Sequence, residues 1–158
     1  MFSLPDHSAD QHVLRESILQ TVQHVTEGEH DLIANLANAA SIMYHALPDV
    51  NWSGFYLFDG TELVLGPFHG RPACIRIALG RGVCGTAAME RRTVVVPDVE
   101  AFPGHIACDV ASRSEVVVPM FRAGVLVGVL DVDSPIVERF SADDVRLLEE
   151  IVAVLMSR

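Results

Sequence analysis

The sequence contains no lysine, and its 11 basic residues, all arginines, stand against 21 acidic residues. The formal net charge is −10. An acidic surface without a basic stripe argues against nucleic acid or an anionic membrane as the partner. No apolar run approaches the roughly 20 residues that span a bilayer, so no transmembrane helix is expected. The N-terminus lacks a basic start followed by a long apolar core, so no signal peptide is expected either.

Cysteine is scarce, with only Cys74, Cys84 and Cys108. An odd number of cysteines in a chain without an expected export signal indicates thiols in a reducing compartment rather than a disulfide scaffold. The expected location is therefore the cytoplasm. Charged residues are also few, at 20%, while half of the residues are apolar, which excludes intrinsic disorder. A chain of 158 residues is expected to form a single domain over 1–158.

Hydrophobic periodicity predicts helices at both ends of the chain and strands between them. Two helices are expected over about 10–27 and 31–47, a short one over about 85–91, and a last one capped by Ser141. The second helix is expected to turn inward Leu32, Ile33, Leu36, Ala39, Ala40 and Met43. Strands are expected over 52–58, 63–66, 74–78, 93–96, 115–121 and 125–132.

These elements predict an α+β fold. Its N-terminal helices lie at about 10–47, its antiparallel sheet and active-site loops at about 50–134, and its C-terminal helix at about 141–157.

Each cysteine has a structural and a chemical interpretation. Cys74 lies inside a predicted strand, which favours a small buried apolar residue. Cys84 stands between a glycine turn and a helix start, where exposed N–H groups and the helix dipole favour a thiolate. Cys108, between His105 and Asp109 in a long polar connection, is a candidate nucleophile because loops commonly carry functional residues. The residues alone leave burial and reactivity open.

Asp131 and Asp133 stand two apart on a predicted strand, so their side chains share one face. A tight turn at 122–124 would bring Glu115 on the preceding strand close to both. Such carboxylates could bind an ammonium group or hold a proton through a raised pKa. The alternative is a strand that runs out into solvent at its polar end.

Trp52 and Tyr56 share a strand face, with Gly54 leaving room between the two rings. They form either ordinary core or an aromatic slot for an apolar ligand group. A further alternative joins His105 to the three cysteines as a zinc site, although the spacing does not resemble the usual short pairs of ligands.

The segments NWSGFY, ACIRIALGRGVCGTA, DVEAFPGHIACDVASRSEVVVP and GVLDVDS occur in this order. On these motifs the chain resembles the free methionine-(R)-sulfoxide reductase family, a branch of the GAF-domain fold, from the first helix onward. The resemblance implies helices packed on one face of the sheet and loops closing a pocket on the other. It also implies an L-methionine (R)-S-oxide reductase. Because GAF domains often pair through their terminal helices, a homodimer is one expectation.

The resemblance also implies roles for the thiols. Cys108 matches the nucleophile, Cys74 the resolving cysteine, and Cys84 a third cysteine that can serve as an alternative resolving thiol. Attack on the sulfoxide sulfur would release methionine and leave a sulfenic acid, which a second thiol converts into a disulfide. Thioredoxin or another dithiol would reduce that disulfide, with no metal or organic cofactor.

The remaining matches describe the substrate pocket. Glu115, Asp131 and Asp133 match the substrate-binding carboxylates, and Trp52 and Tyr56 match the aromatic wall. The competing interpretation is a non-enzymatic GAF module that senses a small ligand or redox state through the same pocket. The combination of thiols and carboxylates favours the enzyme, because a ligand sensor has no need of both.

Overall fold

Six strands form one antiparallel sheet in the computed structural model, which describes residues 3–6, 10–106 and 109–158. The strand order across the sheet is β3-β2-β1-β6-β5-β4. The strands are β1 (Trp52–Phe58), β2 (Glu62–Gly70), β3 (Arg76–Ala78), β4 (Val94–Val96), β5 (Ser114–Arg122) and β6 (Val125–Ser134). The predicted α+β class with an antiparallel sheet is therefore confirmed.

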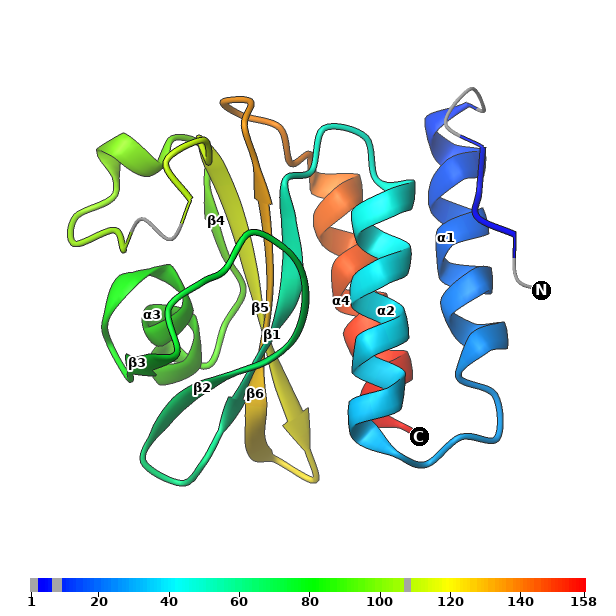
Figure 1. The fold of residues 1–158 in the computed structure, drawn as a ribbon, viewed down its shortest axis with the longest axis horizontal. Helices are drawn as coiled ribbons and strands as arrows, with labels where there is room; N and C mark the ends of the chain where they lie inside the picture. The colour runs from blue at the N-terminus through cyan, green and yellow to red at the C-terminus, as the bar shows by residue number, and fades with distance from the viewer. Residues whose placement is uncertain (1–2, 7–9, 107–108) are drawn as a thin grey trace.

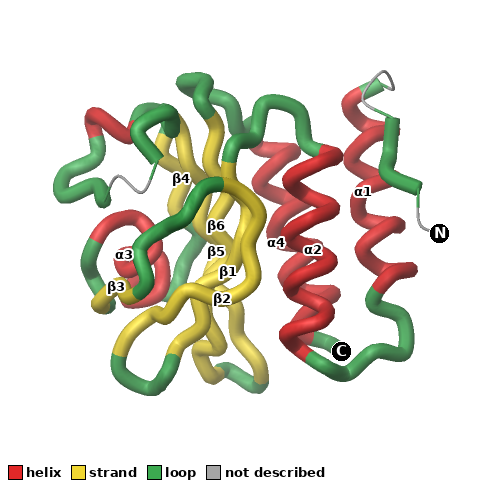
Figure 2. The backbone as a smooth tube through the Cα atoms, viewed as in Figure 1, coloured by secondary structure: helices red, strands yellow, loops and turns green. Residues whose placement is uncertain are grey.

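Three long helices cover one face of this sheet: α1 (Gln11–Val25), α2 (Leu32–Ala46) and α4 (Ala142–Met156). α2 packs on β1 and β2, α4 packs on β5, and α1 forms an outer layer against α2 and α4 (Figure 1). The short helix α3 (Gly82–Glu90) and the 3-10 turn η1 (Val99–Ala101) lie on the opposite side with most of the longer loops (Figure 2). Within the described ranges, no helix combines the length and the apolarity needed to cross a membrane.

The sheet separates two apolar clusters. The larger lies under the helix layer and includes Ile18, Leu36, Phe55, Leu130 and Leu148. The smaller lies between the sheet and α3 and includes the buried members Trp52, Tyr56, Leu63, Ile77, Val83, Cys84, Ala87, Val117 and Val129. Because alternate residues of a strand face opposite sides, each central strand contributes to both clusters.

One residue of α2 is not placed as predicted. Ile33 was expected to face inward, but its exposed fraction is 52%. The buried side of α2 includes Asn35, Ile42 and Ala46, and this rotates the helix so that Ile33 lies at the edge of the packed stripe.

Helix α4 begins as predicted at a cap formed by Ser141. The Ser141 side chain accepts a hydrogen bond from the N–H of Asp144, and the Asp144 carboxylate accepts one from the N–H of Ser141. Asp144 is buried and also pairs with Arg15 of α1 at 2.9 Å and with Arg139 at 2.7 Å. One carboxylate thereby joins α1, α4 and the segment before α4.

Asp144→Ala is expected to lower the free energy of unfolding at neutral pH by about 2–3 kcal/mol, because it leaves two partly buried guanidinium groups without their partner. Burial alone would raise the pKa of Asp144. The hydrogen bond from the Ser141 N–H and the charges of Arg15 and Arg139 lower it by more than burial raises it, so the net shift is downward. A lowered pKa stabilises the fold above the unfolded value, and this contribution is lost as the pH falls through the folded value.

Urea unfolding at a series of pH values measures this effect. Wild type should lose more stability than Asp144→Ala below about pH 4, where an ordinary aspartate begins to protonate. Asp143→Ala is the control, because its carboxylate is exposed, pairs with the exposed Arg146 and lies 3.9 Å from Arg15, so it should contribute less than about 1 kcal/mol. Equal effects of the two substitutions on the free energy of unfolding would contradict the stabilising role of the buried Asp144 ion pairs.

Candidate active site

Three acidic residues gather on the sheet face opposite the long helices. Glu115 of β5 pairs with Asp133 of β6, and Asp133 pairs in turn with Trp52 of β1. Asp131 lies two residues before Asp133 and shares its face. Glu115 and Asp131 are 6% and 7% exposed, and Asp133 is half-buried. The strand therefore does not run out into solvent here, and the predicted gathering of these residues, hereafter the carboxyl cluster, is confirmed.

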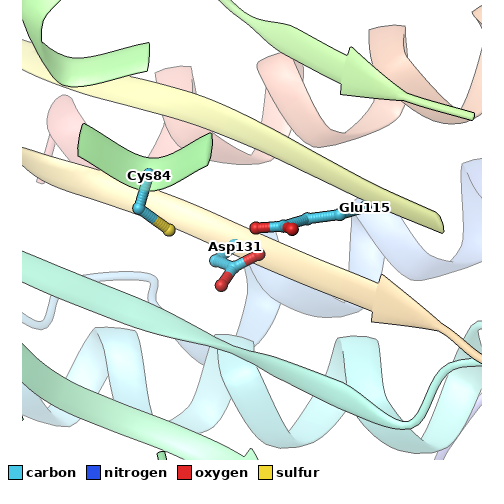
Figure 3. A group of neighbouring side chains, drawn as sticks. All are labelled: Cys84, Glu115 and Asp131. Carbon is cyan, nitrogen blue, oxygen red and sulfur yellow. The ribbon is translucent and has the colours of Figure 1, made fainter. Parts of the chain in front are cut away.

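Cys84 of α3 faces the carboxyl cluster from the side of the sheet opposite the long helices. Helix α3 begins at Gly82, three residues earlier than predicted, which places Cys84 in its first turn. One ligand-type atom from each of Cys84, Glu115 and Asp131 lies within 4.8 Å of the others. Figure 3 shows these three side chains converging from α3, β5 and β6.

Burial raises the pKa of every member of the carboxyl cluster well above its usual range. The neighbouring carboxyl groups raise these pKa values further: Asp133 acts on Glu115, Glu115 acts on Asp131, and Asp131 acts on Asp133. Acidic groups this close do not all ionise together, because each anion disfavours the next. The carboxyl cluster is therefore biased toward its protonated forms.

Of the two interpretations of Cys84, the structure supports the buried thiol and not the thiolate. Burial raises the pKa of this thiol well above its ordinary value, and the negative charges of Asp131, Glu115 and Asp133 raise it further. The helix N-terminus favours an anion, but here the desolvation and the neighbouring carboxylates outweigh it. Cys84 is a neutral thiol in the protein without a bound cation.

His105 extends the carboxyl cluster toward the surface. Its Nε2 atom lies 3.3 Å from Glu115 Oε2, and its side chain is 15% exposed. Burial lowers the pKa of His105 and raises that of Glu115, so neutral forms are favoured on both sides. Burial therefore disfavours the charged pair and favours a hydrogen bond between the two groups.

The two predicted aromatic residues lie side by side on β1. The Trp52 ring stacks on Tyr56 at 6.1 Å between ring centroids and on Phe68 at 5.3 Å. The Trp52 indole N–H donates to the carbonyl of Arg71 at 3.0 Å, and the Tyr56 hydroxyl donates to the carbonyl of Cys74 at 3.0 Å. Both rings are almost fully buried, so they form a fixed wall beside the carboxyl cluster.

A small cavity lies between this wall, α3 and the carboxyl cluster. Its volume is about 20 Å³, and it is lined by Tyr56, Ile77, Arg81, Gly82, Val83, Cys84, Ile106, Glu115 and Asp131. A space of this size holds about one water molecule. Trp52 is not among the lining residues, so of the two predicted wall residues only Tyr56 borders the cavity in this conformation.

Cys74 is not the buried strand residue that its pattern predicted. Strand β3 begins only at Arg76, and Cys74 is half-buried in the segment before it. The N–H of Leu65 reaches the carbonyl of Ile75 at 2.8 Å, whereas the Cys74 carbonyl accepts the Tyr56 hydroxyl. At Cys74 the carbonyl is therefore bonded to the Tyr56 side chain and not to the backbone of β2, and the β2–β3 ladder does not extend to this residue.

Cys108, the predicted nucleophile, lies outside the described residues. The residue after it, Asp109, is 8% exposed and accepts hydrogen bonds from Asn51 Nδ2 at 3.2 Å and from the N–H of Ala111 at 2.9 Å. Asn51 Nδ2 also lies 3.1 Å from Ser112 Oγ. Asp109 is close enough to Asp133 to raise its pKa. The chain just after Cys108 is thus anchored beside the carboxyl cluster.

Residues Asn51 and Ser112 were not identified from the sequence as part of the site. The available signal was a polar residue directly before the first strand, and such residues are common at strand ends. The alternative zinc set included Cys108, which lies outside the described residues. In the part of the chain that the structure describes, the cluster of candidate ligands is Cys84, Glu115 and Asp131, without Cys74 or His105.

Gly54→Ala is expected to destabilise the fold by about 2–3 kcal/mol, because overpacking a close-packed interior forces its neighbours apart. A Cβ atom at Gly54 would lie 2.3 Å from Phe68 Cβ and 2.8 Å from the Trp52 ring. Urea unfolding measures the change, with Val125→Ala at an exposed position as the control. A stable Gly54→Ala protein with unaltered tryptophan fluorescence would contradict this account of the wall.

Comparisons with known proteins identify relatives of the whole arrangement. The GAF domain family model matches residues 12–158. A free methionine-R-sulfoxide reductase of Escherichia coli (strain K12) is 48% identical over 128 residues, covering 81% of this chain and 78% of that protein. One of Saccharomyces cerevisiae is 41% identical over 148 residues, covering 89% and 82%. The X-ray structure of the Neisseria meningitidis free methionine-R-sulfoxide reductase in complex with its substrate is 45% identical, with a TM-score of 0.94 over 99% of this chain and 95% of that chain.

Proposed function

This chain belongs to the GAF domain family and, within it, to the free methionine-R-sulfoxide reductases, and from that premise we propose that it reduces free L-methionine (R)-S-oxide to L-methionine with its own thiols. The observation that carries the proposal is the carboxyl cluster, buried on the sheet beside an aromatic wall and next to the anchored segment that follows Cys108.

The carboxyl cluster is suited to hold the α-ammonium group of a free amino acid. Burying several carboxyl groups together is costly without a cation, because each disfavours the ionisation of the others. An ammonium group that enters the pocket offsets this repulsion and gains charge-assisted hydrogen bonds. A methionine sulfoxide residue within a peptide has no such ammonium, so it is not expected to bind in this way. The terminal S-methyl group would rest against the rings of Trp52 and Tyr56.

The same cluster can supply the proton that the reaction requires. A sulfoxide oxygen leaves only after it is protonated, so an acid must stand near it. Burial raises the pKa of Glu115 and of Asp131 and so favours their protonated forms, and we assign the donation to a carboxyl group of the cluster. His105, hydrogen-bonded to Glu115 and partly exposed, can pass a replacement proton inward from solvent.

In the first chemical step, the Cys108 thiolate attacks the sulfoxide sulfur while the oxygen takes a proton. The S–S bond of this adduct then breaks as the hydroxyl group passes to the Cys108 sulfur, so that the reduced substrate leaves as methionine and Cys108 is oxidised to a sulfenic acid. In the second step, the thiol of Cys74 or of Cys84 attacks the sulfenic sulfur, water leaves, and a disulfide forms. A dithiol such as thioredoxin then reduces that disulfide by exchange.

Substrate entry requires the cavity to widen. A volume of about 20 Å³ accommodates about one water molecule, and methionine sulfoxide is far larger. The Ile106 side chain lies against Gly82, where a Cβ atom would meet its Cδ1 at 3.0 Å. Ile106 therefore fills the side of the cavity that faces α3, and its side chain has to shift when substrate binds.

Turnover with dithiothreitol tests the proposal. Four compounds are compared: free L-methionine-(R)-sulfoxide, its S epimer, N-acetyl-methionine-(R)-sulfoxide, and a peptide that contains the R epimer. Activity on the free R epimer, with kcat/KM at least about 100-fold lower for the N-acetyl form, is expected because the ammonium is lost. Equal rates on the free and N-acetyl forms would contradict the proposal that the carboxyl cluster binds the α-ammonium group. No activity with fully reduced protein would favour a ligand-sensing GAF domain instead.

A further inference from the structure

The side chains at the base of the pocket also form a set of metal-ligand types. The Cys84 sulfur and the carboxyl oxygens of Glu115 and Asp131 lie within 4.8 Å of one another (Figure 3). Zinc is bound by thiolate and carboxylate at about 2.0–2.3 Å, so atoms that share one tetrahedral ion are roughly 3–4 Å apart. Small rotations of these three side chains are sufficient to bring their ligand atoms to the distances that one ion requires.

A second observation is independent of this proximity. Asp131 is 7% exposed, and its Oδ1 atom is buried without a hydrogen-bond partner among the described residues. The Asp131 carboxyl group shares side-chain hydrogen bonds with Glu115 and Cys84, but an oxygen that stays buried without a partner is costly, and a cation removes that cost. The adjoining cavity of about 20 Å³ admits a particle the size of a water molecule or a metal ion.

We propose that the reduced protein binds one divalent ion of the zinc class through Cys84, Glu115 and Asp131, with water as the fourth ligand. A thiolate in the set selects zinc over magnesium and calcium, which prefer oxygen ligands alone. Three protein ligands and one exchangeable position fit a tetrahedral ion. Binding displaces the proton of the Cys84 thiol, so one proton is released from that side chain as the ion enters.

The ion would act as an inhibitor of the reaction proposed above. This consequence rests on the proposed function, because the ion and the substrate ammonium would neutralise the same carboxylates. Cys84 would also be held as a metal ligand and would be withdrawn from disulfide formation. The ion site itself rests only on the geometry.

Titration of the fully reduced, full-length protein with Co²⁺ tests the site, because a cobalt–thiolate bond gives a charge-transfer absorption. We expect one equivalent of Co²⁺, displaced by Zn²⁺ and not by Mg²⁺, with the absorption kept in Cys74→Ser and Cys108→Ser and lost in Cys84→Ser. Asp131→Asn should weaken binding by about 10–100-fold. If Cys84→Ser does not fold, as judged by circular dichroism, Asp131→Asn decides the question.

Absorption that survives Cys84→Ser, or that is lost in Cys74→Ser or Cys108→Ser, would assign the ion to other thiols and overturn the proposal. So would the absence of a thiolate band, or unweakened binding by Asp131→Asn. L-Methionine should weaken Co²⁺ binding in proportion to its concentration, and failure to do so would overturn the competition. These measurements need no turnover, so their failure is distinct from the failure of the reductase assay.

Discussion

Cys108→Ser is expected to reduce turnover of free L-methionine-(R)-sulfoxide by at least about 10³-fold, as removal of a catalytic nucleophile does in other enzymes. A serine hydroxyl is not ionised near neutral pH and cannot form a sulfenic acid. The measurement is methionine release with dithiothreitol, in wild type and variant. Unfolding in urea should be nearly unchanged, so that the loss is one of chemistry.

Single turnover separates the nucleophile from the resolving thiols. Cys74→Ser and Cys84→Ser should each release about one methionine per protein without reductant, because the first step needs Cys108 alone. The variant that then fails with thioredoxin identifies the resolving cysteine, which the family resemblance assigns to Cys74. A Cys84→Ser protein that releases no methionine, although folded, would move the nucleophile into the pocket and contradict the assignment.

Glu115→Gln is expected to raise the free energy of unfolding at pH 7 by about 1–3 kcal/mol while lowering kcat/KM by at least about 100-fold. The glutamine keeps the shape of the side chain but removes a group whose charged form is poorly solvated. Activity falls because the carboxyl group both binds the ammonium and takes part in proton donation. A substitution that stabilises the fold and disables the site is typical of a functional cluster.

The pH dependence of stability gives this prediction a sign. Burial raises the pKa of Glu115 in the folded protein. For an acid with a raised folded pKa, stability is highest below the unfolded pKa and is lost as the pH rises through the folded value. The gain from Glu115→Gln should therefore be largest at neutral and higher pH and should vanish below about pH 4.

Glu100→Gln is the matched control, because its side chain is exposed and only loosely paired with Arg113 at 3.8 Å. Its effect on unfolding should stay within about 0.5 kcal/mol at every pH. A Glu115→Gln protein that is less stable than wild type at pH 8, or that keeps full activity, would show that the carboxyl cluster is not a strained site.

Local signals predicted much of the fold. Ser141 and Asp144 formed the cap where α4 was expected to begin. The β5–β6 hairpin has a two-residue turn at Ala123 and Gly124, both with positive φ, which suits the right-handed twist of the strands. Regular pairing from that turn would place Glu115 opposite Val132, and the register shift between Met120 and Phe121 moves it opposite Asp133. The hairpin therefore predicted that Glu115 lies near the two aspartates, but the face that it shares with them depends on a bulge that the sequence did not reveal.

The environment of Cys84 was not predictable in the same way. Its glycine turn and helix start suggested an activated thiol, but the packing of α3 on the sheet buries it against carboxyl groups from two distant strands. Cys74 lies outside the predicted strand, because its carbonyl accepts a hydrogen bond from the Tyr56 hydroxyl of β1. Both errors come from tertiary contacts that no local pattern encodes. The disulfide partner of Cys108, the homodimer and the cytoplasmic location remain predictions.

The pocket divides its tasks between two kinds of structure. The carboxyl groups and the aromatic wall stand on the central strands β1, β5 and β6, whereas the sequence predicts the nucleophile in a connection between strands. The backbone of a strand that is paired on both sides is held by two ladders of hydrogen bonds, whereas a connecting segment lies at the surface and tolerates change more readily. Loss of the single thiol at position 108 would leave the carboxyl cluster and the aromatic wall in place. A substitution at this one position would therefore remove the proposed chemistry and leave the proposed binding site on the sheet unchanged.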